Sequence, residues 1–197
     1  MPPKNRNNGK HELILDAAVR VFAERGYHQT TISQIARQAG VADGTIYLYF
    51  KNKEDILATF VRQRSEHFFE CFKQEVDKQK NAVDKLHKLV RLHFREAEVD
   101  MHKAFVYQVE MRTNRRLMRG EIMEALKMYL DTVGTILEEG QQEGSVRHDL
   151  YIGLAKRMIF ASVDEVITTW VRSGGKYDLI PLAEPLVDMI LSGLSPR

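Results

Sequence analysis

Residues 30–57, TTISQIARQAGVADGTIYLYFKNKEDIL, decide the fold of this chain. The stretch contains two short helical segments, each with apolar residues on one side, and Gly40 lies in the turn between them. Thr31 and Gln34 have the spacing of a capping box, which predicts the start of the first helix. The second helix is expected over about Asp43 to Phe50. A pair of this kind forms a helix-turn-helix, whose second helix enters the major groove of DNA.

The remaining sequence predicts helices throughout and no sustained strand pattern. Apolar residues recur three and four positions apart over 13–22, 83–97, 122–137 and 154–170. Helix ends are predicted from glycines, capping side chains and prolines. The residues concerned are Gly26, Asn52, Gly144, Asp149, Gly174, Gly175 and Asp178, with Pro185 expected to kink the final helix or delay its start. The chain is therefore expected to be all-α.

Composition limits the classes of protein that fit. The 197 residues are 44% hydrophobic and include a single cysteine, Cys71, so neither an intrachain disulfide nor a thiolate metal cluster is expected. The N-terminus lacks the apolar core of a secretory signal, and we expect a cytoplasmic protein. Residues 1–53 hold eight Lys and Arg against four Asp and Glu, whereas the remainder holds 21 against 23. This excess of positive charge suits a segment that meets phosphates.

The expected recognition helix has one side for the core and one for DNA. Ile46 and Phe50 are predicted to face inward. Hydroxyl groups, a close backbone approach and a lysine are then available for bases and phosphates. The expected DNA-contacting residues are Thr31, Ser33, Gly44, Thr45, Tyr47, Tyr49 and Lys53. Tyr47 and Tyr49 have an alternative role at the edge of the core, and Thr31 has a compatible role as a helix cap.

Over about residues 10–60 the sequence resembles the Tet repressor family. The resemblance is carried by order, spacing and residue type together, from Phe22 and Gly26-Tyr27 through the run 30–57. It implies about nine helices, with an effector-binding domain after the helix-turn-helix. We expect a flexible basic arm at 1–10, a DNA-binding domain at 11–53 and an effector-binding and dimerisation domain at 54–197. It also implies a homodimer through the last two helices and a palindromic operator, with recognition helices roughly 34–36 Å apart. The arm (Lys4, Arg6, Lys10) is expected either to enter a minor groove or to be disordered.

The C-terminal part contains an unusual arginine cluster at 112–119. Guanidinium groups suit phosphate oxygens, and the nearby sequence is rich in apolar and aromatic residues, so a ligand with a long acyl chain and a phosphorylated head is expected. The candidate effector-binding residues are Phe68, Phe72, Phe94, Phe105, Val109, Arg112, Asn114, Arg115, Arg116, Arg119, Phe160 and Trp170. The competing interpretation is a solvated turn with surface ion pairs beside an ordinary aromatic core.

A second, shorter resemblance bears on the effector. Residues 106–112 and Asn114 are similar to the corresponding stretch of the acyl-CoA-responsive fatty-acid-degradation repressors of Gram-positive bacteria within this family. It implies that long-chain acyl-CoA releases the protein from DNA. An unphosphorylated hydrophobic or cationic compound, as sensed by repressors of multidrug-efflux genes, is the alternative.

Two other classes of protein are the alternatives to a ligand-responsive repressor. An enzyme is not favoured, because the seven histidines form no H-x-x-x-H or H-E-x-x-H pair and the sequence has no G-x-S-x-G elbow or phosphate-binding glycine loop. No cofactor and no metal site are expected. An architectural DNA-binding protein without an effector would show weak sequence preference and no response to small molecules.

Overall fold

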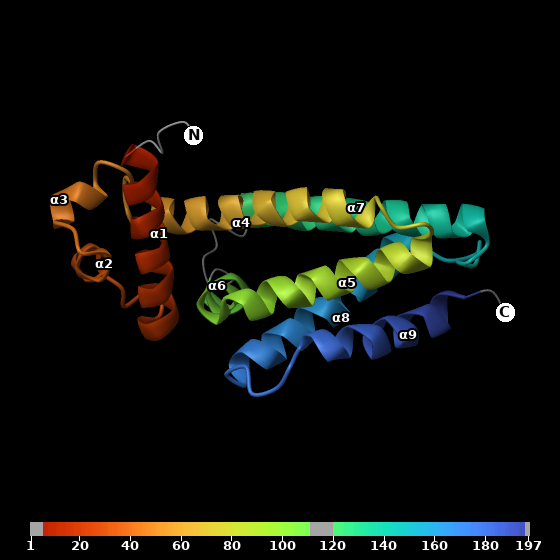
Figure 1. Ribbon diagram of the computed structural model, residues 1–197. Helices are drawn as coiled ribbons and strands as arrows, with labels where there is room; N and C mark the ends of the chain where they lie inside the picture. Colours follow the sequence, from red (N-terminus) through yellow and green to blue (C-terminus); the bar gives the residue numbers. More distant parts are fainter. Residues whose placement is uncertain (1–5, 111–119, 196–197) are drawn as a thin grey trace.

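The computed structural model describes residues 6–110 and 120–195, and all regular structure in these ranges is helical. The predicted all-α fold is thereby confirmed. Three helices form a block at one end of the molecule (Figure 1): α1 (Arg6–Arg25), α2 (Ile32–Ala39) and α3 (Asp43–Ile46). Within the described ranges, no helix is both long and apolar enough to cross a bilayer.

The first helix begins earlier than expected. It starts at Arg6, so residues 6–10 of the segment expected to form the arm are part of α1. Once a helix has nucleated, each further residue adds a hydrogen bond at little cost, and no proline interrupts this segment. Lys4 lies outside the described residues, and the contact of the arm with DNA stays a prediction.

The two ends of α2 are as predicted. The Thr31 hydroxyl accepts from the Gln34 backbone N–H (3.3 Å), and Gln34 Oε1 accepts from the Thr31 backbone N–H (2.9 Å). Gly40 ends the helix with φ +66°, a conformation that favours glycine.

The expected helix from Asp43 to Phe50 is shorter in the structure. Regular α-helix stops at Ile46, and the N–H groups of Leu48 and Tyr49 bond to carbonyls three residues back (3.2 and 3.0 Å). The chain therefore continues as a tighter turn of the 3₁₀ type, which rotates the side chains after Ile46 relative to an α-helix.

A long helix connects the N-terminal block to the rest of the molecule. It is α4 (Lys53–Val76), which the Asn52 side chain caps by accepting from the Asp55 N–H (2.8 Å), as predicted. In Figure 1 it lies along α7 (Glu121–Glu143), which ends at Gly144. Along the sequence, α4 is followed by α5 (Ala82–Val99), α6 (Met101–Phe105) and a π-helical turn, η1 (Val106–Glu110), all of which precede α7.

The last two α-helices are α8 (Ile152–Arg172) and α9 (Ala183–Leu194), and a 3₁₀ turn, η4 (Ile180–Leu182), leads into α9. The predicted Asp149 cap is wrong, because α8 begins three residues later after Tyr151 and the Asp149 carboxylate faces Arg147 (3.7 Å). The late start of the final helix is confirmed. Pro185 falls in its first turn, where a backbone N–H would have no helical partner.

Two groups of buried residues form separate cores. The first joins α1, α2 and α3 to the start of α4, as far as Val61, and also takes in Val106 from η1. This packing unit extends past residue 53, the boundary expected for the DNA-binding domain. The second core fills the space between α4, α5, α7, α8 and α9.

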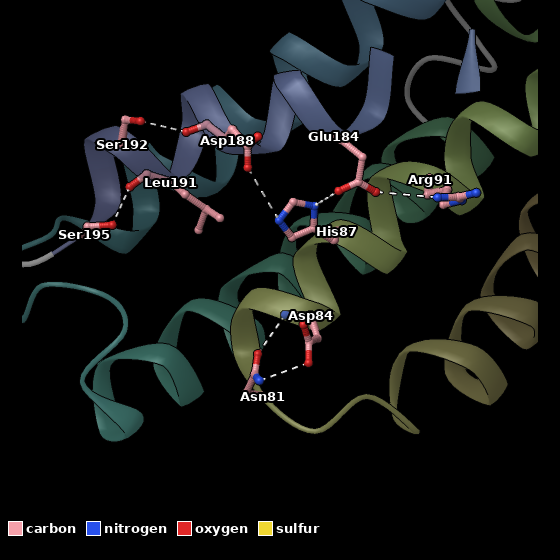
Figure 2. A network of polar contacts seen from close by, with 9 residues as sticks. All are labelled: Asn81, Asp84, His87, Arg91, Glu184, Asp188, Leu191, Ser192 and Ser195. Carbon is pink, nitrogen blue, oxygen red and sulfur yellow. Dashed lines mark hydrogen bonds and ion pairs between the residues drawn. The ribbon is translucent and has the colours of Figure 1, made fainter. Parts of the chain in front are cut away.

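A polar network holds α9 against α5. Figure 2 shows His87 of α5 between two acids of α9, with Nδ1 2.9 Å from Glu184 Oε2 and Nε2 3.9 Å from Asp188 Oδ1. Arg91 lies 3.6 Å from the other Glu184 oxygen. These contacts lie on the side of α9 that faces α5 of its own chain.

Candidate functional site

The recognition segment has the two sides that the sequence indicated. Ile46 and Phe50 are buried, whereas Tyr47 is 59% exposed. Leu48 is 80% exposed and is not among the expected contacts, which are polar side chains and a glycine backbone. Its position midway between the two buried residues was the available signal. An exposed isobutyl group here suits contact with a thymine methyl group.

Gly44, Thr45 and Tyr49 differ in how closely the rest of the chain packs against them. A Cβ built on Gly44 meets no atom within 4 Å, and its φ is not left-handed, so no contact within the described chain requires glycine at this position. Thr45 is half-buried. Tyr49 is also half-buried, packs against the first core and lies 6.4 Å from the His11 ring between centroids. Tyr49 thus has much of the edge-of-core role described as its alternative.

The start of α2 carries the next pair of expected contacts. Thr31 is exposed while it caps the helix. The Ser33 hydroxyl donates to the Asp43 carboxylate, which ties α2 to α3. Because this proton is already used within the chain, Ser33 has its backbone N–H and its oxygen left for an external partner.

Lys53 is held by the chain itself. Its ammonium donates to the carbonyl oxygens of Tyr27 (2.7 Å), Thr30 (3.0 Å) and His28 (3.3 Å), and it lies 4.5 Å from the centre of the Tyr27 ring. Burial lowers the pKa of Lys53, against the opposing charge of Glu54. An ammonium has three N–H donors, and the turn between α1 and α2 accepts from all three.

A cavity of about 280 Å³ lies in the second part of the molecule. Its volume is near the small end of the roughly 300–1,000 Å³ range of ligand sites. Five helices and the π-helical turn line it. The lining residues are Arg64, Ser65, Phe68 and Phe69 of α4; His93, Glu96 and Ala97 of α5; Ala104, Tyr107 and Gln108 of α6 and η1; Ala125, Leu126 and Tyr129 of α7; and Phe160, Asp164 and Ile167 of α8.

Only part of the expected effector site meets at this cavity. Phe68 and Phe160 line it. The other aromatic and aliphatic candidates within the described residues pack elsewhere: Phe72, Phe94 and Trp170 in the buried core, and Phe105 and Val109 against it. The five polar candidates, Arg112, Asn114, Arg115, Arg116 and Arg119, lie outside the described residues.

Polar residues in the cavity wall had not been anticipated. His93 interrupts the apolar face formed by Leu89, Val90 and Phe94, and this interruption was the signal available in the sequence. Burial, with help from the charge of Arg64, lowers the pKa of His93 to about 3. Burial raises the pKa of the Tyr129 phenol above its ordinary range, and Asp164 adds to the effect. Both side chains are therefore uncharged at neutral pH.

The segment 101–110 touches both the cavity and the N-terminal core. Ala104, Tyr107 and Gln108 line the cavity, while Val106 between them is fully buried in the first core. Lys103 of the same segment lies 3.0 Å from Asp16 of α1. A change in the cavity wall at this point would be felt directly by the packing of α1.

Comparison with known proteins agrees with this arrangement. Residues 14–59 match the family model for bacterial regulatory proteins of the tetR family, and residues 61–193 match the model for the YsiA-like protein C-terminal region. The chain is 44% identical to the fatty acid metabolism regulator protein of Bacillus subtilis over 185 residues, which cover 94% of this chain and 95% of that protein.

Solved structures give the same result. The fatty acid degradation regulator FadR from Bacillus halodurans has a TM-score of 0.89 and 41% identity, covering 99% of this chain and 100% of that one. The regulator FadR from Bacillus subtilis in complex with stearoyl-CoA has a TM-score of 0.86 and 44% identity, covering 93% and 98%. The chain therefore belongs to the tetR family of bacterial regulatory proteins.

Proposed function

We propose that this protein represses transcription by binding a palindromic operator as a dimer, and that a long-chain acyl-CoA releases it, in the control of fatty-acid degradation. The observation that carries the proposal is the aromatic-walled cavity against α4, the helix that starts directly after the recognition segment. The similarity to a fatty acid metabolism regulator and to a regulator solved with stearoyl-CoA supports the choice of ligand.

DNA contact is assigned to the exposed side of α2 and α3. Tyr47, Leu48 and Thr45 would meet base edges, and Gly44 would let the backbone approach the groove closely. Thr31 and Ser33, with the N-terminal amides of α2, would bind a phosphate, as would Tyr49. We assign Lys53 a positioning role first, because its donors are directed to the turn between α1 and α2.

The acyl chain is assigned to the cavity and the phosphorylated head to the arginine cluster. Arg112, Asn114, Arg115, Arg116 and Arg119 follow directly in sequence after η1, whose Tyr107 and Gln108 line the cavity. Guanidinium groups bind phosphate oxygens through paired N–H donors, so this short separation along the chain suits one ligand with both parts.

Dimerisation is assigned to α8 and α9. Leu154 and Met158 of α8, Met189 of α9 and Tyr151 directly before α8 are large apolar residues, and all four are exposed. On a helix pair whose inner side is already fixed by the second core and by the His87 network, such residues favour an interface with a second copy.

Release from DNA is assigned to the segment 101–110 and to α4. A ligand that displaces Tyr107 or Gln108 also moves Val106, which belongs to the first core. For this displacement to act as a switch, the ligand must bind the conformation with the DNA-incompetent spacing more tightly than the competent one.

The test measures operator affinity with DNA selected from a random pool, over a range of salt concentrations, with and without stearoyl-CoA. We expect salt-sensitive, sequence-specific binding that acyl-CoA weakens about 5- to 150-fold. Coenzyme A alone and stearate serve as controls. Sequence-specific binding that no acyl-CoA changes would remove the effector assignment.

An unphosphorylated hydrophobic effector is the second candidate, and the aromatic wall of the cavity favours it. Release by planar hydrophobic cations but not by acyl-CoA would support it. Weak sequence preference together with indifference to every ligand would instead indicate an architectural protein.

A further inference from the structure

Two polar atoms in the wall of the cavity have no hydrogen-bond partner within the described chain. They are the Tyr129 hydroxyl and His93 Nδ1, and both atoms are buried from solvent. Both side chains line the cavity. A buried donor or acceptor without a partner is unfavourable, and native structures leave few of them. A ligand that supplies the missing partner would remove this deficit.

The surroundings of this pair are otherwise aromatic. Ring centroids lie 5.0 Å apart for Phe68 and His93, 5.5 Å for His93 and Tyr129, and 5.4 Å for Tyr129 and Phe160. A plain hydrocarbon chain fits such a wall but cannot pair with a phenol or an imidazole. The wall therefore suits an apolar ligand that carries a hydrogen-bonding atom at one point.

The pair is suited to a neutral acceptor. The phenol keeps its proton at neutral pH and donates, while the imidazole carries no charge because burial holds its pKa near 3. Asp164 also lines the cavity, and its charge is felt at Tyr129. A ligand carboxylate would meet this negative charge. Arg64 is turned to the Glu96 carbonyl oxygen (3.0 Å) and to the face of the Tyr107 ring.

We propose that Tyr129 donates a hydrogen bond to the thioester carbonyl oxygen of the bound acyl-CoA, with His93 as a second polar contact beside it. The proposal rests on the function proposed above and adds the group of the ligand that the cavity recognises. The cavity would then distinguish a thioester from a free carboxylate and from a thioether, independently of chain length.

The test compares stearoyl-CoA with S-octadecyl-CoA, a thioether that has CH₂ in place of the carbonyl group. Titration calorimetry gives the affinity of each for the full-length protein. We expect the thioester to bind about tenfold more tightly, the ratio that one hydrogen bond to an otherwise unpaired buried donor gives. Tyr129→Phe should bring the ratio close to one.

Tyr107→Phe is the matched control. It removes another tyrosine hydroxyl from the same wall, but one that already has the Ser65 hydroxyl 3.5 Å away. The thioester-to-thioether ratio should stay near tenfold in this variant, whatever happens to overall affinity. A loss of the ratio in Tyr107→Phe and not in Tyr129→Phe would overturn the assignment.

A measurement on the unmodified protein keeps the proposal testable if Tyr129→Phe does not fold. The infrared carbonyl stretch of stearoyl-CoA labelled with ¹³C at the thioester should fall in frequency on binding, as it does for a hydrogen-bonded carbonyl. Equal affinities of the unmodified protein for the two ligands, or an unshifted band, would overturn the inference while leaving acyl-CoA as effector. If neither ligand binds, the proposed function fails with it.

Discussion

Lys53 fixes the start of α4 to the turn between α1 and α2. Its ammonium donates to three carbonyl oxygens and lies over the Tyr27 ring. We predict that Lys53→Met lowers the free energy of unfolding by about 1–3 kcal/mol, because hydrogen bonds to a charged group are lost and the carbonyls keep no equivalent partner. Chemical denaturation followed by circular dichroism measures the change.

Lys51 offers a control two residues away. It is exposed, and Lys51→Met should alter the free energy of unfolding by less than about 0.5 kcal/mol. If both variants are equally stable and differ only in DNA affinity, Lys53 acts on phosphates and not on the turn.

His93 makes the free energy of unfolding depend on pH. Its pKa is about 3 when folded, against an ordinary value of 6.5. Between these two values the unfolded chain binds a proton that the folded chain does not, and stability therefore falls as pH falls. We predict that His93 contributes a loss of about 1.4 kcal/mol per pH unit between about pH 6 and pH 4.

The variant His93→Phe isolates this contribution. All other titrating groups are shared, so denaturation curves of the two proteins across the same pH window should differ by the His93 slope alone. Parallel pH profiles would mean that the imidazole can be protonated in the folded state.

Among the helices, α3 contains Gly44, a glycine that we attribute to contact with DNA and not to packing within the protein. None of the residues that the structure describes requires glycine at position 44, and alanine is the better helix former. We predict that Gly44→Ala leaves the melting temperature unchanged or slightly raised while it weakens operator binding at least tenfold, because the methyl group holds the helix away from the groove. Fluorescence anisotropy with labelled operator, next to a thermal melt, separates the two effects. Undiminished affinity would remove Gly44 from the interface.

Local signals in the sequence predicted the helix boundaries that depend on neighbouring residues. The capping box at Thr31, the Asn52 cap and the turn at Gly40 each involve contacts across three to five residues, and all were predicted correctly. The Asp149 cap was wrong because α8 starts only at Ile152, after Tyr151, which provides no side-chain cap. The recognition helix was overestimated since the side-chain pattern does not distinguish an α-helix from a 3₁₀ turn over so few residues.

At the scale of the whole molecule, the cavity depends on contacts that sequence spacing does not reveal. Phe68 and Phe94 both lie on the apolar face of a helix as judged from the sequence. In the structure, Phe68 lines the cavity whereas Phe94 is fully buried in the core. Which of them faces the opening depends on the relative rotation of α4, α5 and α7. The ring centroids of Tyr129 in α7 and Phe160 in α8 lie 5.4 Å apart, and this contact also depends on how the helices are rotated.

The proposed dimer makes a prediction at this scale. Met158 is 61% exposed in the middle of α8, among the apolar residues assigned to the interface. Met158→Glu would bury a charge without a partner in the dimer, and we expect light scattering to report a mass near 22.8 kDa where the unmodified protein gives about twice that value. Val99→Glu is the control, since Val99 is 75% exposed at the end of α5 and belongs to neither of the two helices assigned to the interface. The monomer should remain folded but bind a palindromic operator about 10²-fold or more weakly, because two linked half-site contacts become one. Retention of the double mass in Met158→Glu, with tight operator binding, would place the interface on another surface.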